Sequence, residues 1–121
     1  MIRDQRTEHF KKKELACPCC DVMGMDHEFL EILESVRTEY GKPMRLNSAF
    51  RCFDYNAKVL GAKPSSSHCR GLAVDIACEG SRHRSELIRH LLKHVTRIGV
   101  GDGFLHADHD LAKDNNVIWT Y

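Results

Sequence analysis

The sequence predicts an α+β fold, a small antiparallel sheet with two main helices packed on it, and three observations support this prediction. Residues 26–41 and 81–95 carry apolar side chains at three- and four-residue spacing, which places these side chains on one face of a helix. Several shorter stretches alternate large apolar residues with small or polar ones, as strands do. The length of 121 residues corresponds to one domain on the usual scale of roughly 100–200 residues. We therefore expect a single domain over residues 1–121.

The two predicted helices have recognisable ends. Asp26 precedes the first helix as an N-cap, and Gly41 followed by Pro43 ends it. The second helix is predicted to begin near Ser81. The apolar face of the first helix consists of Phe29, Ile32, Leu33, Val36 and Tyr40. The apolar face of the second consists of Leu87, Ile88, Leu91, Leu92 and Val95.

Alternating patterns predict about four short strands. They are residues 44–50, 72–77, 104–108 and 117–121. In the last of these, Trp119 and Tyr121 are predicted to be core residues, the alternative being that they line a cleft. The other segments are a polar, Cys-containing N-terminal segment of the same domain (1–24), a short helix (54–60) and a Ser-rich loop (63–67).

Composition and charge exclude several classes of function. Eighteen Lys and Arg residues against 17 Asp and Glu residues give a formal net charge of +1, so no strong field attracts nucleic acid or an anionic membrane. No apolar run approaches the ~20 residues that span a bilayer. The first residues are basic but lack the apolar stretch of a secretory signal, so we expect synthesis in the cytoplasm. We expect neither a nucleic-acid nor a membrane partner.

Six cysteines stand out in this short chain: Cys17, Cys19, Cys20, Cys52, Cys69 and Cys78. An even number of cysteines in a small protein can form disulfides, but no secretory context supports that here. Cys17, Cys19 and Cys20 could also provide thiolates to a metal ion, although no second Cys pair at zinc-ribbon spacing follows to complete a tetrahedral site. Three alternatives stay open for this group: reduced structural thiols, a disulfide to Cys52, or a structural metal site.

The most informative segment contains His68 and, seven residues later, Asp75. Gly71 between them allows the backbone to turn tightly. Alternation places Asp75 between Val74 and Ile76 in a strand that we expect to be buried, where an unpaired carboxylate would be costly. A metal ion or a strong hydrogen-bond network should therefore satisfy Asp75, and imidazole and carboxylate are both good ligands for Zn²⁺.

A second segment adds His106. In a strand over residues 104–108, Phe104, His106 and Asp108 share one face. His106 then joins His68 and Asp75 as a third candidate ligand. Three protein ligands with a fourth position left for water are typical of catalytic zinc sites, whereas structural sites are closed by four protein ligands.

Four motifs, in order along the chain, are similar to those of one enzyme superfamily. They are LNSAFRC (46–52) with Asn56 and Gly61-Ala62, SSSHCRGLAVDI (65–76), FLHAD (104–108) and the final WTY (119–121). Together they resemble the zinc D-Ala-D-Ala carboxypeptidase and murein endopeptidase superfamily, which includes D-alanyl-D-alanine dipeptidases, phage endolysins and the zinc domain of Hedgehog proteins. The resemblance is greatest to the small bacterial and phage branch. It runs from about residue 10 to the end and implies an α+β fold with a zinc site in a cleft on the sheet.

The resemblance implies a role for individual residues. It makes His68, Asp75 and His106 the ligands of Zn²⁺. It also implies that Arg51 binds a carboxylate or carbonyl of the substrate near the metal, which suits a guanidinium group that stays charged and can bind a carboxylate through two hydrogen bonds. Ser48 and Ser66 are then expected to line the cleft and contact the substrate or orient neighbouring side chains.

The sequence departs from the family pattern at the general base. Many relatives carry an acidic residue three positions before the last His ligand, where this chain has Gly103. Asp108, Asp102 and His109 are the alternative candidates. Asp108 is the first choice because alternation places it on the same face as His106, the alternative being that it holds a ligand histidine in place.

Two hypotheses about function follow from the resemblance. The first is a monomeric zinc peptidase that cleaves bonds next to D-amino acids in the peptide of peptidoglycan, with Arg51 and Asp108 as catalytic residues. The second is a non-catalytic, zinc-stabilised binding or structural module of the same fold, such as a component of a phage particle. For the first hypothesis, we expect the protein to reach the cell wall through lysis, a holin or a phage particle. The sequence leaves carboxypeptidase and endopeptidase activity open.

Overall fold

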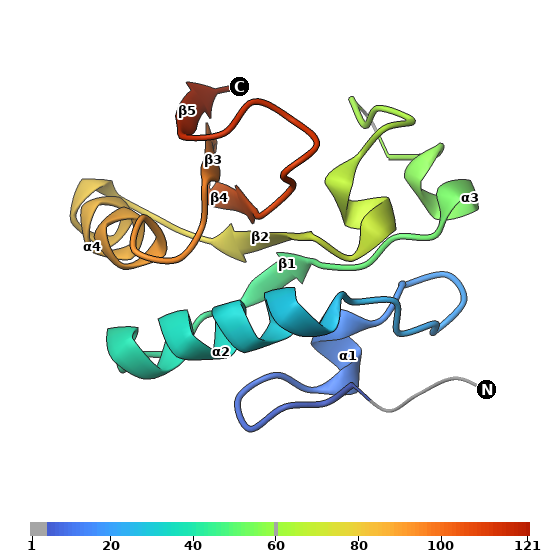
Figure 1. Ribbon diagram of the computed structural model, residues 1–121, viewed down its shortest axis with the longest axis horizontal. Helices are drawn as coiled ribbons and strands as arrows, with labels where there is room; N and C mark the ends of the chain where they lie inside the picture. Colours follow the sequence, from blue (N-terminus) through green and yellow to red (C-terminus); the bar gives the residue numbers. More distant parts are fainter. Residues whose placement is uncertain (1–4, 60) are drawn as a thin grey trace.

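The computed structural model describes residues 5–59 and 61–121 and confirms the α+β class (Figure 1). Its helices are α1 (Lys12–Leu15), α2 (His27–Tyr40), α3 (Phe53–Asn56), the 3₁₀ helix η1 (Ser67–Arg70) and α4 (Ser81–Leu91). Its strands are β1 (Leu46–Ser48), β2 (Ala73–Ala77), β3 (Arg97–Gly101), β4 (Phe104–Asp108) and β5 (Val117–Thr120). The start of the predicted N-terminal segment and the last residue of the predicted helix 54–60 lie outside the described residues. Within the described part of the chain, no helix has the length and apolar character needed to cross a membrane.

The sheet is mixed rather than antiparallel, which corrects one part of the sequence prediction. The strand order is β1-β2-β4-β3-β5, and every neighbouring pair is antiparallel except β3 and β5, which are parallel. The connection over residues 109–116 brings the chain back so that β5 begins beside Arg97, at the start of β3. The sequence does not predict strand β3, because its glycines, Gly99 and Gly101, interrupt the alternation of large side chains.

Helix α2 begins and ends where the sequence predicts, whereas α4 ends earlier than predicted. The Asp26 carboxylate accepts a hydrogen bond from the Phe29 N–H (3.0 Å), and Gly41 ends α2 in the left-handed conformation with φ of 72°. Helix α4 begins at Ser81 as expected. It ends at Leu91, so the next residue, Leu92, is 52% exposed instead of buried on the apolar face.

One face of the sheet forms the core with α2 and α4. Val74 and Ile76 of β2 and Leu105 and Ala107 of β4 are fully buried in the same cluster as the apolar faces of the two helices. Because side chains alternate along a strand, the residues between them point to the opposite face. The candidate metal ligands of β2 and β4 are therefore placed away from the helices.

Gly71, directly after η1, packs against the backbone of Gly24 and Asp26 in the N-terminal part of the chain. It has a φ of 70°, and its carbonyl accepts a hydrogen bond from the Asp26 N–H (3.0 Å). A Cβ atom at this position would lie 2.1 Å from the Gly24 carbonyl oxygen. The tight passage between η1 and β2 thus requires glycine both for its backbone conformation and for the close approach of Gly24.

We predict that Gly71→Ala destabilises the protein by about 2–5 kcal/mol, the sum of a left-handed Ala and an overpacked contact. The control is Gly41→Ala, which also has positive φ (72°) but no atom within 4 Å of the added Cβ. We expect only the conformational cost in the control, about 1–2 kcal/mol. Urea denaturation of both variants checks the difference, and equal destabilisation would contradict the role of the contact.

Candidate active site

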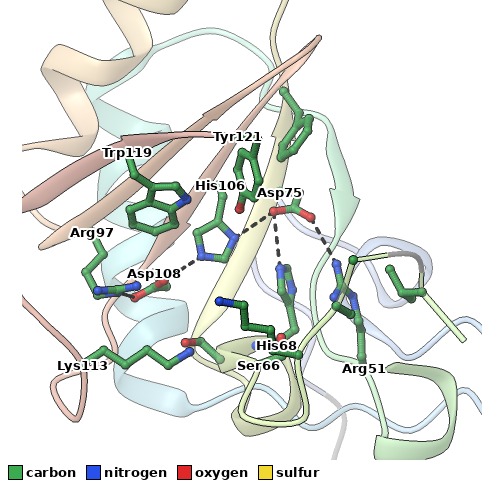
Figure 2. A pocket seen from close by; sticks show the side chains of 16 residues that line it. Arg51, Ser66, His68, Asp75, Arg97, His106, Asp108, Lys113, Trp119 and Tyr121 are labelled. Carbon is green, nitrogen blue, oxygen red and sulfur yellow. Dashed lines mark hydrogen bonds and ion pairs between the residues drawn. The ribbon is translucent and has the colours of Figure 1, made fainter. Parts of the chain in front are cut away.

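A pocket of about 460 Å³ lies on the face of the sheet opposite the helical core (Figure 2). It contains all three candidate metal ligands, together with the candidates Arg51, Ser66 and Asp108. Basic and aromatic side chains from distant segments complete its wall: Lys63, Arg97, Phe104, Lys113, Trp119 and Tyr121. Of the sequence candidates, Ser48, Asp102 and His109 are not among the lining residues.

Asp75 and His106 are brought together by strand pairing. They are direct partners in the antiparallel register of β2 and β4, and their side chains leave the same face of the sheet. The Asp75 Oδ1 atom lies 3.0 Å from His106 Nδ1. Two residues that are 31 positions apart in sequence therefore meet as a consequence of the sheet alone.

His68 reaches the same point from outside the sheet. It lies in η1, where the Ser66 hydroxyl caps the helix by accepting a hydrogen bond from the His68 N–H (3.2 Å). The His68 ring is buried, and its Nδ1–H donates to the Ala49 carbonyl (2.7 Å). Since a carbonyl can only accept, this bond leaves the Nε2 lone pair free, and Nε2 lies 3.4 Å from Asp75 Oδ1.

His106 is oriented by the same principle. Its Nε2–H donates to the carboxylate of Asp108, with 2.6 Å between Nε2 and Oδ2. Nδ1 faces Asp75, as Figure 2 shows. In the neutral ring Nδ1 carries the lone pair that a metal ion would accept, and in the protonated ring it donates a hydrogen bond to Asp75. In both histidines the outer ring nitrogen is held by an acceptor and the inner nitrogen points to a common centre. This is the arrangement by which proteins prepare histidines to bind metal ions.

The three inner atoms fit one metal ion. His68, Asp75 and His106 each offer a ligand atom, and these atoms all lie within 4.8 Å of one another. Ligands about 2.1 Å from a tetrahedral Zn²⁺ ion lie about 3.4 Å apart, close to the 3.0 and 3.4 Å separations from Asp75 Oδ1. The donor set of two neutral imidazoles and a carboxylate leaves a fourth position for water or substrate, as catalytic zinc sites do.

The electrostatics of the site also favour a cation. Burial by itself would raise the pKa of Asp75, but hydrogen bonds with His106 and His68 outweigh it and hold this pKa well below its usual value. Burial would lower the pKa of His106, but hydrogen bonds with Asp108 and Asp75 raise it. The surroundings of Asp75 and His106 thus stabilise positive charge between them, and a metal ion would take the place of a proton there.

Asp108 is buried, and both of its carboxylate oxygens are engaged. Oδ2 binds His106, while Oδ1 pairs with the Arg97 guanidinium (2.9 Å) and accepts the Asp110 N–H (3.1 Å). Its bond to the outer nitrogen of His106 places Asp108 behind the ring rather than beside the common centre. Of the two alternatives for Asp108, these contacts favour the one in which it holds a ligand histidine in place.

Arg51 is nearly buried and makes contacts through its whole guanidinium group. Nε donates to the Ser48 hydroxyl (3.1 Å), Nη1 to the Asn56 side-chain oxygen (3.2 Å), and Nη2 to Asp75 Oδ2 (3.3 Å). Ser48 therefore contacts Arg51 instead of the pocket. Arg51 lines the pocket and also fixes the second oxygen of Asp75, so that Oδ1 faces the histidines.

Sequence reasoning missed Asp110 and the basic residues Lys63, Arg97 and Lys113, and it misplaced two aromatic residues. Asp110 is buried and accepts a hydrogen bond from Ser67 (2.6 Å), next to His68, but its position after the end of β4 gave no periodic signal. Trp119 and Tyr121 line the pocket, and Tyr121 is 71% exposed, so the prediction that they are core residues is wrong. Trp119 lies in β5 and Tyr121 directly follows it, at the edge of the sheet, where none of the described helices covers the pocket face (Figure 1).

Comparison with known proteins identifies the family. The sequence profile of the family Peptidase M15 matches residues 8–109, a range that includes His68, Asp75 and His106. A search among curated proteins finds no match. Peptidases of the M15 family are zinc-dependent, in agreement with the donor set described above. The resemblance to the zinc D-Ala-D-Ala carboxypeptidase superfamily is thereby confirmed, and the chain belongs to the peptidase M15 family.

Proposed function

We propose that the protein is a zinc peptidase that cleaves bonds next to D-amino acids in the peptide of bacterial peptidoglycan. The observation that carries this proposal is the convergence of His68 Nε2, Asp75 Oδ1 and His106 Nδ1 at a pocket, in a chain of the M15 family. When bound, Zn²⁺ polarises a peptide carbonyl and lowers the pKa of a water molecule. The chain's own residues hold the three ligands in place and supply the pocket that binds the substrate.

The wall of the pocket supports a peptide substrate that carries a carboxylate. Arg51 and Arg97 already neutralise the aspartates of the site. Lys63 and Lys113 are the remaining basic residues of the wall, and the Lys113 Nζ lies 3.9 Å from its nearest carboxylate, a loose contact. In the proposed reaction these lysines would attract a carboxylate of the cell-wall peptide, and the aromatic rings of the wall would offer apolar surface to short side chains such as that of D-Ala.

A second candidate function is a non-catalytic zinc-stabilised module. It is favoured by the pocket-lining carboxylates that the structure describes, Asp75 and Asp108, because both have partners in the protein. Neither is placed as a free proton acceptor, and Gly103 has no side chain to offer. The first experiment below separates the two candidates.

Incubation with purified peptidoglycan tests the proposal directly. We expect the zinc-loaded protein to release peptide fragments that mass spectrometry can assign, which also distinguishes loss of a terminal residue from internal cleavage. Release should stop with a chelator, which removes the ion, and in His68→Ala, which removes one of its ligands. Release should continue in the control His27→Ala, which changes an exposed histidine of α2 outside the pocket. A folded, zinc-loaded protein that releases nothing would support the non-catalytic candidate.

Arg51→Lys tests the proposed role of this residue in binding substrate. Replacing the guanidinium by an amine removes a charge-assisted hydrogen bond worth about 1.5–3 kcal/mol, so we expect kcat/KM to fall about 10–150-fold. Zinc content should stay unchanged, because the lysine keeps a positive charge near Asp75. Arg45→Lys, an exposed arginine outside the pocket, is the control and should leave kcat/KM unchanged. Loss of zinc in Arg51→Lys would show that its main role is to hold Asp75.

Asp108→Asn separates the two roles considered for this residue. If Asp108 holds the His106 ring, we expect zinc affinity of the pocket to fall about 10–100-fold, as measured by competition with a chelator. Asp102→Asn, an exposed change outside the pocket, should have no effect. Unchanged zinc affinity with turnover reduced about 10²–10⁴-fold would instead identify Asp108 as the general base.

A further inference from the structure

A second group of metal-ligating side chains lies outside the pocket. It consists of the thiols of Cys17, Cys19, Cys20 and Cys52, and we name this group the thiol cluster. Each thiol offers one sulfur, and the four sulfurs all lie within 4.8 Å of one another. Three of the residues come from the turn after α1, and Cys52 is the N-cap of α3. The fold thus supplies the fourth ligand that the sequence motif lacks.

The sulfur separations match a closed tetrahedral site. Cys19 Sγ lies 3.6 Å from Cys17 Sγ and 3.4 Å from Cys52 Sγ. Four sulfurs about 2.3 Å from one Zn²⁺ ion are about 3.8 Å apart, whereas the sulfurs of a disulfide are bonded at about 2.05 Å. All four thiols are free in the structure.

Backbone contacts prepare two of the sulfurs to carry negative charge. The Cys52 N–H donates to Cys17 Sγ, and the Tyr55 N–H donates to Cys52 Sγ, each over 3.4 Å. Donors of this kind stabilise thiolates and orient them toward a metal ion. The turn that carries the other thiols is closed by hydrogen bonds from the Cys17 N–H to the Val22 carbonyl and from the Asp21 N–H to the Cys17 carbonyl, both of 2.9 Å.

We propose that the thiol cluster binds one Zn²⁺ ion in a structural site that is separate from the pocket. Four thiolates around a single ion leave no open position, which is typical of zinc sites that stabilise a fold rather than catalyse a reaction. The ion would join the N-terminal segment to the start of α3, because Cys17 and Cys52 are 35 positions apart in sequence. Arg51, which holds Asp75, directly precedes the Cys52 ligand.

Titration of the reduced, metal-stripped full chain with Co²⁺ tests the proposal. Thiolate ligands give an intense charge-transfer absorption with cobalt that a site of two histidines and an aspartate does not give. In His68→Ala, whose pocket lacks a ligand, we expect this absorption to saturate at one equivalent and to disappear when Zn²⁺ replaces the cobalt. The absorption is also expected in the unchanged chain, so the result is independent of the proposed peptidase function.

Two variants and a control complete the experiment. Cys52→Ser and Cys20→Ser each remove one of the four thiolates, so we expect cobalt affinity to fall and the thiolate absorption at one equivalent to decrease. Cys20 is exposed, so its replacement leaves the core intact. The control Cys78→Ser changes a thiol outside the cluster and should keep the absorption. Two results would overturn the proposal: a folded, reduced protein without the absorption, or a protein isolated with a Cys19–Cys52 disulfide and no zinc released on denaturation.

Discussion

The antiparallel pairing of Asp75 with His106 is the constraint on which the site depends. The two side chains leave directly opposed positions of β2 and β4, so their separation is set by the spacing of the strands. A slip of one residue in this register would turn either side chain into the helical core and bring Val74 or Leu105 to the pocket. The core residues on the other face of the same strands oppose that slip, because burying them fixes the register. The packing of the core residues on one face of the sheet thereby positions the side chains of Asp75 and His106 on the other face.

The acids around the pocket, of which Asp108 and Asp110 are buried and Asp75 is half-buried, follow a common pattern, since each is paired with an arginine from a different segment. Three such pairs occur: Asp75 with Arg51, Asp108 with Arg97, and Asp110 with Arg70. A buried carboxylate without a partner would take up a proton or destabilise the fold, so these pairs allow several acids to lie close to one site. The arrangement also fixes which oxygen faces inward. Asp75 presents one oxygen to the histidines because the other is held by Arg51.

Arg51 and Cys52 link the two proposed metal sites through adjacent residues. Arg51 contacts the second oxygen of an expected zinc ligand, and Cys52 belongs to the thiol cluster at the start of α3. The Arg51 N–H also donates to the His68 carbonyl (3.2 Å), so the segment contacts two of the three ligands of the pocket. An ion in the thiol cluster would hold this segment against the N-terminal turn. In this arrangement the proposed structural site would support the geometry of the proposed catalytic site without sharing a ligand.

The sequence by itself determined the α+β class, the caps of α2, the start of α4 and the alternation that separates His106 from the core, because these depend on local periodicity and capping. The spacing of His68, Asp75 and His106 identified the candidate ligands, and the family match agrees with the motifs that contain them. Only the tertiary structure decided the parallel pairing of β5, the exposure of Tyr121 and the contacts of Asp108, since each depends on segments that approach from far along the chain. The same holds for the thiol cluster. Its fourth sulfur comes from Cys52, and no spacing rule relates that residue to Cys17 until folding brings α3 beside the N-terminal turn.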